Sequence, residues 1–84
     1  MVTKETLNDV CDGLQDLAKR YKLNNREGDV LRLKTTEQAI KSLRMVILTM
    51  EMKGDMTDVE FYFDPEEGKS GWMTIDANQN SKFY

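Results

Sequence analysis

The most informative absence from this 84-residue sequence is histidine, the commonest general base and the commonest metal ligand in proteins. Without histidine, Ser–His and Cys–His catalytic pairs are excluded. A single cysteine, Cys11, excludes an intramolecular disulfide and a multi-cysteine zinc site. Because Cys11 lies on an apolar helix face, we expect a buried structural thiol. We expect a protein that is not an enzyme and holds no metal or cofactor.

Long apolar runs are also missing, since the longest, residues 45–50, is interrupted by Thr49. The sequence therefore predicts no membrane span, and the first ten residues do not resemble a signal peptide. A small chain without disulfides fits a reducing compartment, so we expect a cytoplasmic protein. With one proline and no low-complexity tract, we expect one domain over residues 1–76 and a polar tail at 77–84.

The net charge of −3 is not typical of a nucleic-acid binder, but the charge is segregated along the chain. Residues 5–16 carry four acids and no base, residues 19–44 carry a net +5, and residues 51–67 a net −6. Acidic and basic elements that face each other within one fold explain this pattern without a partner. Alternatively, the basic segment binds phosphates, or the acidic surface binds a basic protein.

A first helix is predicted from Lys4, after the candidate N-cap Thr3, to the pair Asn24–Asn25. Its apolar residues recur at helical spacing: Leu7, Val10, Cys11, Leu14, Leu17, Ala18 and Tyr21. An acidic stripe lies almost opposite: Glu5, Asp9, Asp12 and Asp16. This stripe is either a solvated outer face or a strip that meets a basic partner.

A second helix is predicted from Thr35, which forms a capping box with Gln38, to about residue 53, where Gly54 ends it. Residues 30–34 before it alternate weakly and predict a short strand or an extended arm. The expected core face of this helix has helical spacing: Ala39, Ile40, Leu43, Val46, Ile47 and Met50.

Three more apolar residues of this helix, Met45, Leu48 and Met52, form a stripe nearly opposite the core face. A helix that is apolar on two sides does not lie on a surface with one side in water. Either the helix is central, between the first helix and a sheet, or the stripe is a contact surface. Lys41 lies on this stripe one turn earlier, and Arg44 flanks it.

The last part of the chain predicts a β-hairpin. Residues 58–64 alternate strictly, with Val59, Phe61 and Phe63 on one face, and residues 71–76 return after a turn at 65–71. We therefore expect an α+β fold, with two amphipathic helices packed on a small antiparallel sheet in the order α-(β)-α-β-β. Carboxylates gather at the hairpin without the spacing of an EF-hand: Asp58, Glu60, Asp64, Glu66 and Glu67.

These patterns favour a non-catalytic protein-interaction module, in which the stripe supplies apolar contact and the hairpin carboxylates form an acidic rim. A homodimer is compatible with this hypothesis. An inhibitor of a nucleic-acid enzyme is the most specific form of this hypothesis, because an acidic surface imitates nucleic acid. In size and acidity the chain resembles the general run of small phage or mobile-element accessory proteins, which is compatible with an inhibitor of a host protein.

Two alternatives stay open at this point. One is an oligomeric small-ligand or nucleotide binder with its site between subunits, because one chain of this length encloses little. The other is an RNA- or DNA-binding accessory protein that uses the basic residues of the middle segment: Lys19, Arg20, Lys22, Arg26, Arg32, Lys34, Lys41 and Arg44.

Overall fold

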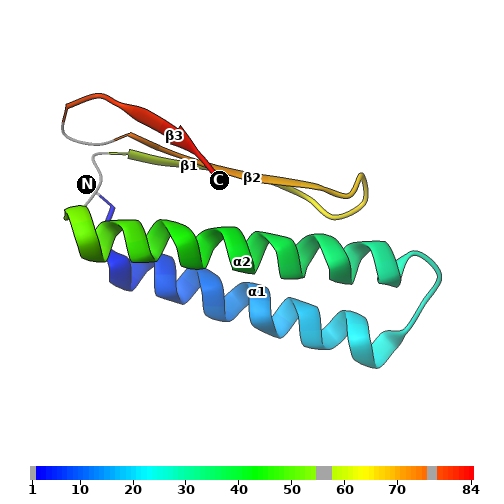
Figure 1. Cartoon of the computed structure of the whole chain (residues 1–84). Helices are drawn as coiled ribbons and strands as arrows, with labels where there is room; N and C mark the ends of the chain where they lie inside the picture. Colours follow the sequence, from blue (N-terminus) through cyan, green and yellow to red (C-terminus); the bar gives the residue numbers. More distant parts are fainter. Residues whose placement is uncertain (1, 55–57, 76–77) are drawn as a thin grey trace.

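The computed structural model of the chain describes residues 2–54, 58–75 and 78–84. Its elements follow in the order α1 (Lys4–Asn24), α2 (Asp29–Lys53), β1 (Asp58–Asp64), β2 (Lys69–Ile75) and β3 (Ser81–Phe83). The strands form one antiparallel sheet in the order β1-β2-β3, so the predicted α+β class is confirmed. In Figure 1, α2 lies between α1 and the sheet, and its contacts with both layers agree with this view.

Helix α1 begins and ends where the sequence predicts. The Thr3 side chain accepts a hydrogen bond from the Thr6 N–H at 3.3 Å, which satisfies one of the free donors of the first turn. At the other end, Asn25 has a φ of +45° and donates its N–H to the Tyr21 carbonyl. The buried residues of α1 form the stripe that packs on α2: Leu7, Cys11, Leu14 and Ala18.

Helix α2 begins at Asp29, six residues before the predicted cap Thr35, so the prediction of a strand or extended arm at residues 30–34 is wrong. Gly28 supplies the left-handed conformation that turns the chain into the helix, with a φ of +85°. Thr35 lies inside the helix, where its hydroxyl donates to the Leu31 carbonyl at 2.8 Å. A capping box is a local signal, and here the preceding turn overrides it.

The other predicted features of α2 fit the structure more closely. Gly54 ends the helix with a φ of +92° and donates its N–H to the Met50 carbonyl at 2.8 Å. Five of the six residues expected on its core face are buried: Ala39, Ile40, Leu43, Val46 and Met50. The sixth, Ile47, is half-buried against the same core.

Trp72, at the middle of β2, joins the sheet to α2. Its side chain is 3% exposed, and its Nε1–H donates to the Ala39 carbonyl at 3.3 Å. Phe61, directly across the β1–β2 ladder, stacks on the Trp72 ring with the centroids 4.0 Å apart. Val59 and Phe63 on the same face are partly buried against the core, whereas Phe61 remains 40% exposed. The predicted apolar face of the hairpin therefore covers the helix only in part.

Strand β3 differs from the polar tail expected at residues 77–84. Residues 81–83 pair with β2, and Tyr84 exchanges two backbone hydrogen bonds with Trp72, at 2.8 and 3.3 Å. The Tyr84 hydroxyl also lies 2.7 Å from that of Thr49 on α2. Three residues are too few to show a period of two, so this strand gives no clear sequence signal.

We predict that Trp72→Ala lowers the free energy of unfolding by about 3–5 kcal/mol, because it empties a buried volume and leaves the Ala39 carbonyl without its donor. Tyr62→Ala, on the exposed face of the neighbouring strand, is the control and changes it by about 0.5 kcal/mol. Urea denaturation followed by circular dichroism measures both. Equal effects of the two substitutions would show that Trp72 does not anchor the sheet.

Candidate binding surfaces

The three residues of the predicted apolar stripe remain exposed, at 50% for Met45, 47% for Leu48 and 76% for Met52. α2 is also the central element of the fold, so the structure combines the two alternatives that the sequence left open. One side of α2 packs on α1 and another on the sheet, and the stripe occupies the third side. These side chains are therefore available for contact with another molecule.

Basic residues lie beside this stripe. Lys41 and Arg44 from α2 join Lys19 and Lys22 from α1 in lining a groove of about 560 Å³ between the two helices. Within the described part of the chain, none of the four forms a salt bridge. Glu37 is the one acidic residue among those that line the groove. Half of the eight basic residues singled out in the sequence therefore share one positively charged surface.

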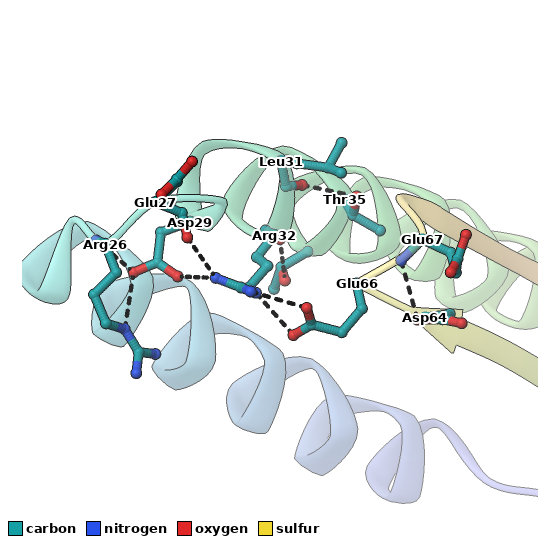
Figure 2. Close-up of polar contacts among 10 residues, drawn as sticks. Arg26, Glu27, Asp29, Leu31, Arg32, Thr35, Asp64, Glu66 and Glu67 are labelled. Atoms are coloured by element: carbon teal, nitrogen blue, oxygen red, sulfur yellow. Dashed lines mark hydrogen bonds and ion pairs between the residues drawn. The ribbon is translucent and has the colours of Figure 1, made fainter.

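The other four basic residues lie elsewhere. Arg20 and Lys34 are exposed and do not line this groove. Arg26 and Arg32 instead bind Asp29, whose side chain is only 2% exposed (Figure 2). The sequence prediction grouped residues by their position along the chain, and the fold divides them between two sites.

Asp29 and Arg32 belong to an ion network that ties the hairpin turn to the start of α2 (Figure 2). Asp29 accepts hydrogen bonds from the Arg26 backbone N–H and from Arg32 Nη1, both at 2.8 Å. Arg32 then donates from Nε and Nη2 to the two oxygens of Glu66, at 2.8 and 2.9 Å. This paired geometry is the strong form of an arginine–carboxylate contact.

The network shifts the pKa values of Asp29, Arg32 and Glu66. The Arg26 backbone N–H, followed by Arg32, lowers the pKa of Asp29, although burial opposes the shift. The guanidinium of Arg32 lowers the pKa of Glu66. Glu66 and then Asp29 raise the pKa of Arg32, which therefore stays charged. Arg32 and Glu66 neutralise each other and are poor candidates for binding a partner.

The remaining hairpin carboxylates lie away from the apolar stripe. Asp58, Glu60 and Asp64 share the outer face of β1, which points away from α2, and Glu67 follows in the turn, where its N–H donates to Asp64 at 3.2 Å. β1 is one edge of the sheet and β3 is the other. Because Tyr84, next to β3, lines a hollow together with Met45, the stripe adjoins the edge opposite β1. The structure therefore does not place the expected acidic rim around the stripe.

On the outer face of the sheet the sequence predicts only the carboxylates Asp58, Glu60 and Asp64 as site residues, and the structure adds apolar side chains between them. Tyr62 is 54% exposed and Phe83 is 77% exposed, while Met73 and Ile75 on the same face are half-buried. The alternation of residues 58–64 already placed Tyr62 among the carboxylates. Phe83 lies in a strand of three residues, too short to show an alternation in the sequence.

The remaining sequence expectations concern single groups. Cys11 is buried as predicted, and its sulfur accepts a long hydrogen bond from Gln15 Nε2 at 3.7 Å. Among the described residues, no group of three or more carboxylates and thiols is arranged to hold a metal ion. None of the described helices is long and apolar enough to cross a membrane. The acidic stripe of α1 is exposed along its length.

Comparison with known proteins adds no functional assignment. No protein-family model, no curated protein and no solved structure matches the chain. The surfaces described above are therefore what supports a function.

The network predicts a stability that depends on pH. Asp29 and Glu66 have lowered pKa values in the folded state, so their stabilisation is complete above their unfolded pKa values, near pH 4. As the pH falls through the lower folded values, this stabilisation is lost. Thermal denaturation between pH 2 and 7 is expected to show a melting temperature that falls with acidification less steeply in Asp29→Asn than in the wild type.

Asp16→Asn is the matched control, since this carboxylate is exposed on α1 and forms no salt bridge within the described part of the chain. It is expected to keep the wild-type slope. If Asp29→Asn also keeps it, the network does not govern the acid stability.

Proposed function

We propose that this protein is a non-catalytic protein-interaction module that binds an acidic, amphipathic segment of another protein through Met45, Leu48 and Met52. One observation carries this proposal: the three apolar side chains are half to three-quarters exposed on a helix that is covered on its other two sides. An inhibitor of a host protein is one form that such a module takes, and that form and a cytoplasmic location stay predictions.

The energetics of the stripe support a contact surface. Fully burying a leucine or methionine side chain is worth about 1.5–3 kcal/mol. If a partner buried the exposed parts of these three side chains, the binding free energy would gain on the order of 3 kcal/mol. Polar residues at the same positions would keep the helix equally stable and more soluble. Met45 and Met52 add flexible side chains that adapt to the shape of a partner.

The charges beside the stripe indicate the chemistry of that partner. Lys41 and Arg44 flank the apolar residues, and Lys19 and Lys22 extend the positive surface across the groove. An amphipathic helix with an acidic flank complements both parts, because its apolar side meets the stripe while its carboxylates meet the groove. Such complementarity gives fast association and an affinity that falls with salt.

We predict that Leu48→Glu keeps the fold and abolishes this binding. Leu48 is 47% exposed, so the melting temperature changes by only a few degrees, as is usual for surface positions. The new carboxylate removes apolar contact and repels an acidic partner. Quantitative capture from a cell lysate, with wild type and variant as baits, identifies proteins held by the wild type and lost with the variant.

Leu23→Glu is the control, because Leu23 is 84% exposed at the end of α1 and lies outside the stripe. It is expected to retain the captured proteins. The proposal fails if Leu48→Glu retains them as well. It also fails if Leu48→Glu unfolds at low concentration, because the stripe is then part of the core.

A second candidate, nucleic-acid binding, is favoured by the groove alone, because it brings together four cations without salt bridges to described residues. The double substitution Lys41→Glu and Arg44→Glu is expected to abolish binding to a mixed-sequence oligonucleotide. The double substitution Arg20→Glu and Lys34→Glu makes the same charge change outside the groove and is the control.

A fluorescence anisotropy titration at rising salt, starting at about 50 mM, measures this binding. The logarithm of the binding constant is expected to fall with the logarithm of the salt concentration, with a slope set by at most about four phosphate contacts. Absence of binding at the lowest salt concentration rules this function out. Leu48→Ser, which removes apolar contact without adding a charge beside Arg44, separates the two candidates: it weakens the protein partner and leaves oligonucleotide binding in place.

A further inference from the structure

The outer face of the sheet forms a second surface, on the side opposite α2 (Figure 1). No helix or strand of residues 2–54, 58–75 and 78–84 covers it. An antiparallel sheet with one solvated face normally presents polar side chains there. This face instead carries aromatic and apolar side chains, Tyr62, Met73, Ile75 and Phe83, among three carboxylates, Asp58, Glu60 and Asp64, with Lys69 opposite Asp64 and Ser81 at one end.

A hollow of about 270 Å³ opens beside Gly71 of β2. Its lining combines five residues of the outer face, Glu60, Tyr62, Gly71, Met73 and Phe83, with Phe61, Trp72 and Tyr84 from the inner face. The strand register creates it, because Gly71 stands opposite Tyr62, and Met73 stands between Glu60 and Phe83. A Cβ atom built on Gly71 has no other atom within 4 Å. The missing side chain therefore leaves open space beside Tyr62, with Met73 next along the same face of β2 and Phe83 beyond Met73.

The dimensions and the lining of the hollow restrict what fits it. Tyr62 and Phe83 stand on the two outer strands, two strand spacings apart and two residues apart along the strands, so their backbones are about 12 Å apart. This separation leaves room for one extended side chain over Gly71. The rings and Met73 offer apolar surface, and the carboxylate of Glu60 adds a negative charge. Asp58 and Asp64 stand on the same face of β1, and Lys69 stands opposite Asp64. The three carboxylates of the face outweigh this one lysine, so the face repels phosphates and other anions.

We propose that this hollow binds a lysine or arginine side chain presented by a basic segment of a partner protein. The methylene stem lies over Gly71 against the rings, and the cation interacts with the ring faces and with Glu60. Asp58 and Asp64 attract the rest of the basic segment and speed its approach. This proposal stands apart from the binding proposed for the α2 stripe, because none of Met45, Leu48 and Met52 lines the hollow.

The test is a titration of the ¹⁵N-labelled protein with an oligo-arginine peptide, followed by amide chemical shifts. Saturable shifts are expected at Tyr62, Gly71 and Phe83. Gly71→Leu fills the hollow and is expected to weaken binding at least about tenfold. Gly13→Leu is the matched control, because Gly13 also has open space around it but lies on α1.

Two further variants complete the test. Phe83→Ser removes a ring that is 77% exposed and reports on the hollow even if Gly71→Leu fails to fold. It is expected to weaken binding to a similar extent. Leu48→Glu is expected to leave the affinity for the peptide unchanged. A negative result for the hollow is therefore distinguishable from a negative result for partner binding by the α2 stripe.

Three outcomes would overturn the proposal. In the first, the shifts spread equally over the exposed carboxylates of α1, which indicates attraction without a site. In the second, Gly71→Leu and Phe83→Ser both bind the peptide as the wild type does. In the third, analytical ultracentrifugation of the protein alone shows a dimer that Phe83→Ser dissolves, so that a second copy occupies this face.

Discussion

The fold depends on the insertion of one indole between the sheet and α2. Trp72 is the largest buried side chain of the sheet, and its Nε1–H reaches the backbone of α2 at Ala39. Every other part of the sheet is arranged around it: Phe61 stacks on its ring from β1, and Tyr84 pairs with its backbone beyond β3. A two-stranded hairpin is marginal in water, so without this anchor the strands have little to hold them together.

The central position of α2 explains why an 84-residue chain presents so much apolar surface. α1 and the sheet cover two sides of α2 and leave the third open, and α2 itself covers only the inner face of the sheet. A small domain buries a limited share of its surface, and here three layers share one core. Met45, Leu48 and Met52 on one side and Tyr62 and Phe83 on the other remain exposed as a result.

The sequence predicts the helical part of this fold well, because helix spacing and end signals are local. Thr3, Asn25 and Gly54 act at the helix ends as expected. The start of α2 differs from the sequence prediction because Asp29 binds the Arg26 N–H and Arg32 across the preceding turn, and Arg32 also binds Glu66 in the distant hairpin, a contact that no local pattern contains. Candidate site residues were named correctly as exposed or charged, but their grouping was not predictable. The order of the strands in the sheet decides which carboxylates lie near which apolar residues. The ion pair with Arg32 also neutralises Glu66, so that this carboxylate no longer contributes to an acidic surface.

The separation of charge between the helix groove and the outer sheet face gives the molecule an electrical polarity that its net charge of −3 conceals. One side, around Lys41 and Arg44, has a positive local potential, while the side around Glu60 and Asp64 has a negative one. In the field of a charged macromolecule, such a particle experiences a torque before it makes any contact. Salt screens this field beyond about 8–10 Å at physiological ionic strength. Inside that distance the field orients the protein, so one side already faces the macromolecule when contact is made.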